Sequence, residues 1–439
     1  MKYFFYSLIA ASTLLGGGIV VVNYYHPSVE LSAGSGTVDS ALSAPKDEKT
    51  IEERIRAAQE KSSRIKGLYM TADVANDQGA GAVRLRNEII RLADTTEING
   101  IVIDTKEVCG PDYDEDNLKK LIQELHQKNI WAIGRVTVFK DASQIDVHPE
   151  WYLKRSTPKA AGDECSRKRY LKVKNPEGKS SGVTFWRDNR GGYWLDPAHE
   201  GAQNYIISFT KQMIDIGFDE IQFDYIRFPS DGDVEKADFP AWDHKTPKYV
   251  ILKHFFELVD RELRQYKPDI ILSADLFGYA AIRSGDVGIG QRLEDIGSSF
   301  DYVSFMVYPS HYYNGLSLPA NIQEGLPAIN LNAHQARLHP DITVGRSLLV
   351  AKEFLESLIA SSTASTTIAT TVSGNIPEPR VRLRPWLEDF FHEADRAAHR
   401  PYGEEKVRLQ IDGAERVASN GWLLWNAANI YTQDALKKE

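Results

Sequence analysis

Short apolar runs alternate with amphipathic helical stretches along most of this chain, and this alternation restricts the fold more than any other feature. The runs have the length of strands and are rich in β-branched and aromatic residues. Eight runs occur, at 66–74, 100–107, 131–139, 220–229, 270–278, 301–309, 381–386 and 421–427. Between them, apolar side chains recur at helical spacing. These helical stretches are 83–96, 115–129, 198–216, 247–266, 342–360 and 404–419.

Strands that alternate with helices predict β-α-β units and a parallel sheet. Eight strands are the number of a closed (β/α)8 TIM barrel, so we expect an α/β protein of this class. An open, doubly wound sheet is the alternative, although no Gly-x-Gly-x-x-Gly motif follows the first run. The barrel would span residues 66–432, with insertions at 140–195 and 361–379, and 433–439 would form a C-terminal tail. The Ser/Thr-rich insertion 361–379 has the composition of a flexible loop.

The N-terminus contains an uncharged segment of 19 residues, Phe4–Val22. It is long enough to cross a bilayer. Lys2 precedes it and the next basic residue is Lys46, so the positive-inside rule predicts a single-pass anchor in the cell membrane with the barrel on the extracytoplasmic side. The alternative is a cleaved signal and a secreted protein. Residues 1–25 would be the anchor or signal, 26–45 a flexible linker and 46–65 a surface helix.

Composition and motifs exclude several classes of function. The net charge is −9 and no long basic stripe occurs, so nucleic acid is not an expected partner. The two cysteines form no CxxC pair, which excludes a zinc knuckle or an iron–sulfur site. No HExxH, GxSxG or Walker motif is present. We therefore expect no cofactor and no metal, with a divalent ion held by carboxylates as an open alternative.

Polar side chains end several of the predicted strands. In a TIM barrel the active site lies at the C-terminal ends of the strands. Side chains alternate between the two faces of a strand, so Gln222 and Asp224 should face the barrel axis, as should Ser273 and Asp275. On the sixth strand Ser304, Met306 and Tyr308 should do the same. The polar strand ends are Asp104, Asp224, Asp275, Tyr308 and Asn426.

An aspartate after a strand often caps the next helix. Neither Asp224, followed by Tyr-Ile-Arg-Phe-Pro, nor Asp275, followed by Leu-Phe-Gly, precedes a helix start. We therefore predict Asp224 as the principal catalytic carboxylate, Asp275 as its partner and Asp104 as a further candidate. Carboxylates on adjacent strands, ~4.8 Å apart, suit acid and nucleophile or base roles at a glycosidic bond. Retaining and inverting outcomes both stay open.

Tryptophans are frequent in the presumed loops of the same face. Flat aromatic rings can cover the apolar face of a sugar. Trp386 and Trp425 flank strand ends, which favours a place in the pocket. Trp151, Trp186 and Trp242 fit either sugar binding or small cores inside the long loops.

Eight motifs follow one another along the chain: GLYMTADVA (67–75), GIVIDTKE (100–107), GRVTVFKD (134–141), YWLDPAHEGAQNYIISFTKQMIDIGFDEIQFDYIRFP (193–229), LSADLFG (272–278), FMVYPSHY (305–312), RLRPWLEDF (382–390) and GWLLWNAANIYT (421–432). In these motifs and their order the chain resembles, over about residues 66–432, a bacterial family of glycoside-hydrolase-like TIM-barrel domains that was long described as a domain of unknown function.

The resemblance implies a barrel that hydrolyses a polysaccharide outside the cytoplasm. Arg227 would hold a carboxylate or an anionic substrate group through paired hydrogen bonds. A carbohydrate-binding barrel without catalysis is the competing function, and metal-assisted polysaccharide hydrolysis is a third. The residues expected to bind substrate are Arg227, Tyr225, Tyr308, Trp386, Trp425 and Asn426.

Cys109 and Cys165 fall in two predicted loops, one after the second strand and one in the insertion 140–195. In a barrel these loops are neighbours on the active face. Outside the cytoplasm disulfides persist, so we expect a disulfide that holds the insertion over the pocket. Two free thiols are the alternative.

Overall fold

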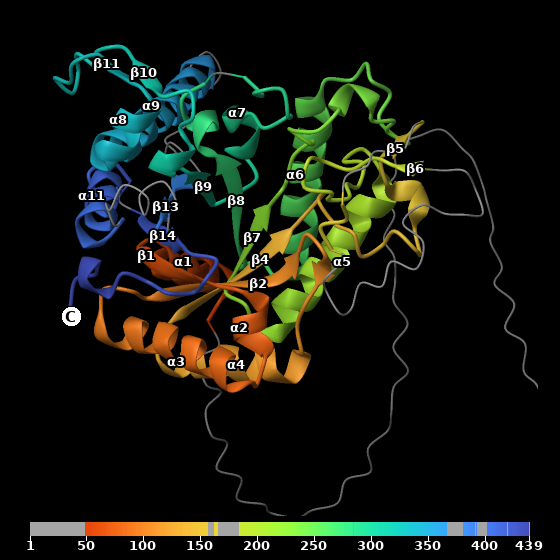
Figure 1. Cartoon of the computed structure of the whole chain (residues 1–439), viewed down its shortest axis with the longest axis horizontal. Coiled ribbons are helices and arrows are strands. Elements are labelled where there is room, and N and C mark those ends of the chain that lie inside the picture. The colour runs from red at the N-terminus through yellow and green to blue at the C-terminus, as the bar shows by residue number, and fades with distance from the viewer. Residues whose placement is uncertain are drawn as a thin grey trace, which may run out of the picture. The chain divides into compact units, whose positions relative to one another are not determined.

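Parallel strands pair in sequence order and close on themselves in the computed structural model (Figure 1). The closure joins β1 (Ile65–Met70) to β2 (Gly100–Glu107) on one side and to β14 (Gly421–Trp425) on the other. β12 (Arg382–Leu383) and β13 (Trp386–Glu388) together occupy the seventh position, beside β9. The remaining barrel strands are β4 (Trp131–Thr137), β7 (Glu220–Asp224), β8 (Ile271–Phe277) and β9 (Tyr302–Met306). The predicted (β/α)8 barrel is confirmed.

The structure describes residues 49–156, 162–165, 184–283, 285–366, 381–390, 392, 402–418 and 420–438. The predicted anchor or signal segment and the linker lie outside this set. Among the described residues, none of the helices has the length and apolar character needed to cross a membrane.

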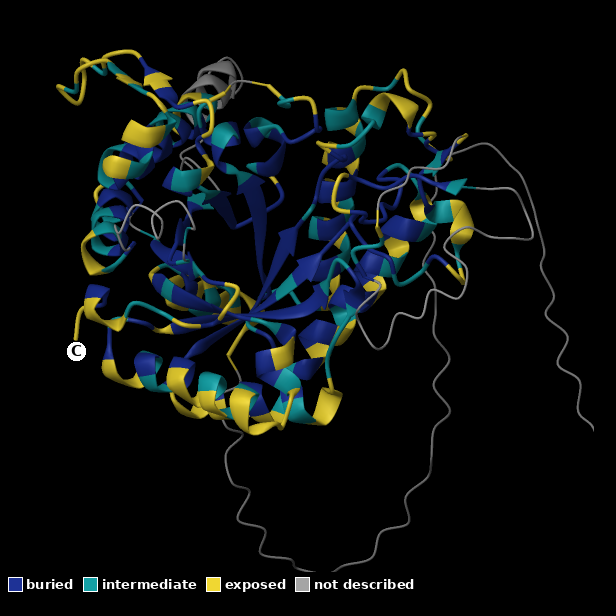
Figure 2. Cartoon of the chain, viewed as in Figure 1, coloured by how far each residue is buried: buried dark blue, intermediate teal, exposed yellow. Residues whose placement is uncertain are grey.

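Helices cover the outside of the barrel, and their outer faces are exposed while the strands are buried (Figure 2). They begin and end within a few residues of the predicted stretches, because an apolar stripe at helical spacing must pack on the sheet. The main ones are α3 (Ala80–Thr95), α4 (Glu115–Gln127), α5 (Glu200–Ile216), α6 (Lys248–Tyr266), α9 (Pro340–Thr366) and α11 (Glu404–Glu415). Shorter elements are α2 (Ala72–Asn76), α7 (Leu293–Ile296), α8 (Ala333–Leu338), β3 (Gly110–Pro111), β5 (Lys154–Arg155), β6 (Thr184–Phe185) and the hairpin β10 (Leu316–Leu318) and β11 (Ile329–Leu331).

The start of the predicted loop 361–379 is wrong, because α9 continues to Thr366. Alanines at 360 and 364 continue a helix at little cost. The rest of that insertion lies outside the described residues.

Helix α1 (Ile51–Ser62) closes the N-terminal end of the barrel with its last turn. The Ser62 hydroxyl lies 2.9 Å from the Tyr302 hydroxyl, and the Ser62 carbonyl accepts a 2.7 Å hydrogen bond from Arg384. The Arg384 side chain also donates to both oxygens of Glu220, at 2.9 and 2.8 Å, and both side chains are fully buried. The buried ion pair of Arg384 and Glu220 thus fills the N-terminal end of the barrel.

Side chains alternate along the strands as predicted. Ile221 and Phe223 belong to the core between barrel and helices. Gln222 points into the barrel, where its amide donates to Ser304 at 3.1 Å. A separate apolar cluster inside the barrel includes Tyr69, Val102, Ile133, Ile271 and Tyr308. The interior below the strand ends is therefore filled, and the inward side chains at the C-terminal ends form the candidate site.

Candidate active site

One arginine joins three carboxylates at the C-terminal ends of the barrel strands. Arg135 on β4 donates from Nη1 to Oδ1 of Asp104 at 2.5 Å, and from Nη2 to Oδ2 of Asp224. Its Nε lies 3.7 Å from Oδ2 of Asp275. The three predicted aspartates therefore come together. Because a guanidinium is a small planar group, the carboxyl groups of Asp224 and Asp275 lie within about 8 Å of each other.

The register of the sheet places Asp224 and Asp275 at the same level. Phe223 on β7 pairs with Ala274 on β8, so the next residue of each strand faces its counterpart. Asp104 and Arg135 are direct partners on β2 and β4. The four residues of the cluster therefore come from four neighbouring strands of the barrel, β2, β4, β7 and β8.

Both oxygens of Asp224 accept hydrogen bonds from the protein. Arg135 binds Oδ2, and the backbone N–H of Tyr225 donates to Oδ1 at 2.6 Å. Tyr225 has φ 51°, a left-handed conformation that is uncommon outside glycine and clusters at functional sites. The Asp224 side chain is 11% exposed, against 1% for Asp275, so Asp224 is the more accessible of the two carboxyl groups.

The net effect of the surroundings of Asp275 is to raise the pKa of its carboxyl group. Burial raises its pKa well above the usual range, and the charge of Asp224 raises it further. The indole of Trp386 on β13 donates to Oδ1 of Asp275 at 2.8 Å. Two carboxyl groups with different environments are the arrangement that separates an acid from a base.

Asp104 lies on the other side of Arg135 from Asp224 and binds the same guanidinium. The Tyr69 hydroxyl and Arg135 both donate to it, while burial raises its pKa. Burial lowers the pKa of Arg135, but the charges of Asp104 and Asp224 outweigh this effect and hold it well above the usual value. The guanidinium therefore stays charged and occupies the centre of the carboxylates.

Aromatic rings form a wall beside the carboxylates. Trp425 lies nearly parallel to Tyr308, with ring centroids 6.1 Å apart, and edge-on to Phe390 at 5.2 Å. Tyr69, the partner of Asp104, lies 5.9 Å from Trp425. The predicted residues Tyr308 and Trp425 thus sit together next to the acids, whereas Trp386 uses its N–H on Asp275.

A family model described as "Putative glycosyl hydrolase domain" matches residues 67–431. The chain belongs to this family. The matched range covers every strand of the barrel except the first two residues of β1, and it includes the carboxylate cluster. No curated protein matches the chain in sequence.

Three solved structures that resemble this glycosyl hydrolase domain each have a TM-score below 0.5, so the barrel assignment rests on the strand register of the chain itself. A hypothetical protein from Ruminiclostridium thermocellum is 27% identical, with a TM-score of 0.35 over 47% of this chain and 96% of that chain. The PgaB (BpsB) glycoside hydrolase domain from Bordetella bronchiseptica is 12% identical, with a TM-score of 0.46 over 84% of this chain and 94% of its own. An alpha-amylase from Geobacillus thermoleovorans is 11% identical, with a TM-score of 0.43 over 84% of this chain and 72% of its own.

Among the described residues, Arg227 forms no ion pair with a carboxylate, while its expected contact with an anionic substrate group stays a prediction. Its Nη1 donates to the carbonyl of Phe228 at 2.9 Å, and its guanidinium lies over the rings of Trp194, Tyr225 and Phe277. Arg135 makes the carboxylate contacts that were expected of Arg227. The alternation along β4 could have found Arg135, because Ile133, two residues earlier, faces the barrel interior.

Asn426 binds its own loop rather than the pocket. Its amide donates to the carbonyls of Asp389 and Ile430, and its carbonyl accepts from the N–H of Ala428 at 2.8 Å. These contacts fix the turn after β14, so the side chain has little left to offer a sugar.

Sequence reasoning also missed Glu388 at the end of β13. This fully buried carboxylate accepts hydrogen bonds from the hydroxyl and the N–H of Ser310, and His392 Nε2 lies 3.5 Å away. Glu388 follows Trp386 by two residues, so the same alternation predicts that both point inward.

The loop tryptophans pack within the loops. Trp186 is fully buried and donates to the carbonyl of Asp233 at 2.9 Å. Trp242 lies against Phe239, at a centroid distance of 5.0 Å, and Trp151 stacks on His148 at 3.8 Å. These contacts favour the interpretation of small loop cores.

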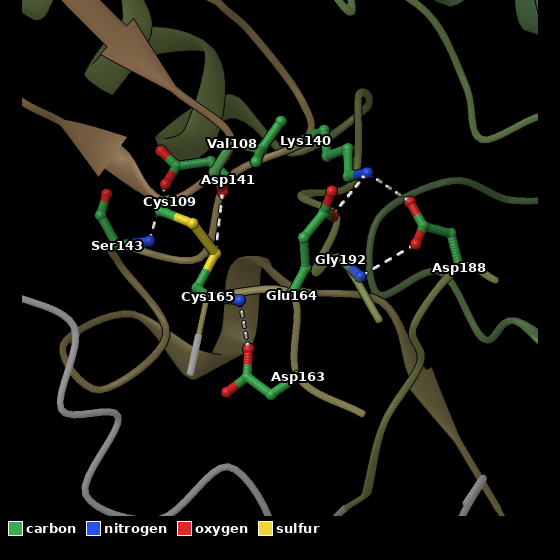
Figure 3. The surroundings of a disulfide bond; sticks show 10 residues. All are labelled: Val108, Cys109, Lys140, Asp141, Ser143, Asp163, Glu164, Cys165, Asp188 and Gly192. Atoms are coloured by element: carbon green, nitrogen blue, oxygen red, sulfur yellow. Dashed lines mark hydrogen bonds and ion pairs between the residues drawn. A yellow bond between two sulfur atoms is a disulfide. The ribbon is translucent and has the colours of Figure 1, made fainter. Parts of the chain in front are cut away.

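The expected disulfide between Cys109 and Cys165 is present, with Cα atoms 5.5 Å apart (Figure 3). It ties the insertion to the loop after β2 and closes a separation of 56 residues.

A cavity of about 470 Å³ lies away from the carboxylates, on the outer surface between β11, α9 and the end of α11. Arg346, one of three basic residues that line it, donates to the carbonyls of Pro319 and Pro327. Within the described part of the chain, no group of three or more His, Cys, Asp or Glu side chains has the arrangement of a metal site.

Proposed function

We propose that this domain is a glycoside hydrolase that cleaves a polysaccharide through Asp224 and Asp275. The observation that supports this most is the contact of both carboxyl groups with one guanidinium, Arg135, from adjacent strands. Their separation of at most about 8 Å falls within the range of paired carboxylates that serve one glycosidic bond.

Asp275 would act as the general acid. Its raised pKa keeps a proton available, and the proton passes to the glycosidic oxygen as the bond to the anomeric carbon breaks. Asp224, ionised and held by Arg135 and by the Tyr225 N–H, would attack the anomeric carbon or take a proton from an attacking water. Asp104 would keep Arg135 in place from the far side.

The aromatic wall would hold the sugar next to Asp224. Tyr308, Phe390 and Trp425 offer flat apolar faces at the strand ends of β9, β13 and β14. Sugar rings present C–H faces that such side chains cover while their hydroxyls stay in water.

The site would work outside the cytoplasm. The uncharged segment Phe4–Val22 supports attachment to the cell membrane or export, and the disulfide supports an oxidising compartment. The polysaccharide would then be one of the cell envelope or of the secreted matrix.

The test is a screen of residues 46–439 against cell-envelope and secreted polysaccharides, with new reducing ends as the readout. The variant Asp224→Asn should lose at least about 100-fold in rate. Asp215→Asn, an exposed aspartate on α5 that accepts from Tyr266, is the matched control and should retain full activity.

Three outcomes would contradict the proposal. Activity of Asp224→Asn within tenfold of the unmodified protein would remove its role. Binding of a polysaccharide without cleavage would favour a carbohydrate-binding barrel. Activity that disappears with a chelator and returns with a divalent ion would favour metal-assisted hydrolysis.

A further inference from the structure

The backbone of Tyr225 determines how Asp224 is held. The Tyr225 N–H donates to Oδ1 of Asp224 at 2.6 Å, and the residue itself has φ 51°. A side chain as large as tyrosine keeps a left-handed conformation only where its surroundings enforce it. Surroundings that hold the backbone and ring of Tyr225 therefore also hold the N–H that binds one oxygen of the proposed catalytic carboxylate.

Two cations and a tryptophan surround the Tyr225 ring. The Lys140 Nζ lies 5.4 Å from the ring centroid, and the Arg227 guanidinium lies 5.1 Å from it. Trp194 packs edge-on, at a centroid distance of 5.9 Å. The Tyr225 carbonyl accepts from the N–H of Phe139, the residue before Lys140. The segment just after β4 thus contacts both the backbone and the ring of Tyr225.

Lys140 is itself held by carboxylates of the insertion. Its Nζ lies 2.7 Å from Oε2 of Glu164 and 2.9 Å from Oδ2 of Asp188, and the side chain is 3% exposed (Figure 3). Asp188 is fixed in turn by the N–H of Gly192 at 2.9 Å and by the indole of Trp194 at 3.0 Å. A lysine removed from water in this way needs both partners to stay in place.

The disulfide holds Glu164 in position. Cys165 follows Glu164 in the sequence and is bonded to Cys109 in the loop after β2. Figure 3 shows the Glu164 carboxylate directed at Lys140 from beside the sulfur atoms. A continuous set of contacts therefore runs from the disulfide through Glu164, Lys140 and Tyr225 to Asp224.

We infer that Lys140 is a positioning residue that orients Asp224 through Tyr225, and that the Cys109–Cys165 disulfide controls this orientation by holding Glu164 against Lys140. The inference rests on the proposed role of Asp224 as the catalytic carboxylate. Reduction of the disulfide would release Glu164, leave Lys140 with Asp188 alone and loosen the ring of Tyr225. Activity would then depend on the thiol–disulfide state of the protein.

The first experiment needs no substrate. A 3-fluorotyrosine placed at position 225 gives a fluorine NMR signal that reports the surroundings of the ring. We expect the signal to shift or broaden in Lys140→Met, in Glu164→Gln and in the disulfide-reduced protein. Lys128→Met, which removes an exposed lysine paired with Asp94, is the control and should leave the signal in place. An unchanged signal in Glu164→Gln and in the reduced protein overturns the inference, even if Lys140→Met fails to fold.

The second experiment uses a polysaccharide that the unmodified protein cleaves. Misplacement of a catalytic carboxylate lowers kcat by about 10- to 100-fold, whereas loss of sugar contacts raises KM. We expect Lys140→Met and disulfide reduction to lower kcat with KM little changed, and Lys140→Arg to recover most of the rate. Equal kcat in Lys140→Met and the unmodified protein overturns the inference. Absence of cleavage by any variant counts against the proposed hydrolase instead, while the fluorine signal still decides the positioning contact.

Discussion

The indole N–H of Trp386 on β13 donates a 2.8 Å hydrogen bond to Oδ1 of Asp275 on β8. The strand β9 lies between these two strands in the barrel. This contact favours the ionised form of Asp275, whereas burial and the charge of Asp224 favour the protonated form. Burial is the larger effect, so the pKa is raised. Trp386, predicted as a sugar platform, thus tunes the proposed acid.

Replacement of this tryptophan should change the pH dependence of hydrolysis. Trp386→Phe removes the N–H that lowers the pKa of Asp275, so the pKa should rise further. A general acid works while protonated, and its activity falls as the pH rises through its pKa. We therefore expect the alkaline limb of the kcat–pH profile to move to higher pH. Trp242→Phe, in a loop core, is the control, and a limb that stays or moves to lower pH would disprove this relationship.

The buried ion pair at the closed end of the barrel should show a strong asymmetry between single and double variants. Arg384→Met leaves Glu220 charged and without its arginine, which should lower the free energy of unfolding by about 3 to 5 kcal/mol. The double variant Glu220→Gln/Arg384→Met should recover much of this loss. Denaturant unfolding measures both. A double variant that loses as much as the two single variants added together would contradict the pairing.

Asp389 should make stability depend on pH. Burial raises its pKa from 3.8 to about 6, although the N–H and hydroxyl of Thr432 both donate to it at 2.7 Å. A raised carboxyl pKa stabilises the fold most below the unfolded pKa, and this stability is lost as the pH rises through the folded pKa. The difference in unfolding free energy between the unmodified protein and Asp389→Asn should therefore fall by about 2 to 2.5 kcal/mol from pH 4 to pH 8. With Asp215→Asn as control, a pH-independent difference would contradict this assignment.

The disulfide should stabilise the fold apart from any effect on catalysis. It closes a separation of 56 residues, so its loss in the Cys109→Ser/Cys165→Ser variant should cost about 4 kcal/mol in the chain-entropy model. Thermal unfolding under non-reducing conditions measures this cost. Equal midpoints for the variant and the oxidised protein would show that the bridge adds no stability.

Local patterns predicted most of the barrel and part of the site. Period-two alternation identified Asp224 and Asp275 as inward residues, and each lies where that pattern puts it. Some predicted strands extend beyond the observed ones, because the chain turns before the apolar run ends. The seventh run of the sequence became two short strands, and β7 ends at Asp224 because Tyr225 adopts a left-handed conformation. No local signal in the sequence marks that turn.

The contacts within the site depend on pairing between distant strands. Arg227 lies in the same motif as Asp224, yet the partner of Asp224 is Arg135, 89 residues away in the sequence. The register between β4 and β7 decides this choice, and a single sequence does not contain that register. Asn426 likewise follows a strand as Asp224 does, but its loop partners occupy it.

The central claim is that Asp224 and Asp275 act together on one glycosidic bond, and a double-variant comparison of kcat tests it most directly. Residues that act as a unit have non-additive effects on rate. On a polysaccharide that the unmodified protein cleaves, Asp224→Asn and Asp275→Asn should each lower kcat by at least about 100-fold, and the double variant should lose about as much as the more severe single variant. Either single variant within tenfold of the unmodified protein, or losses that multiply in the double variant, would contradict the account.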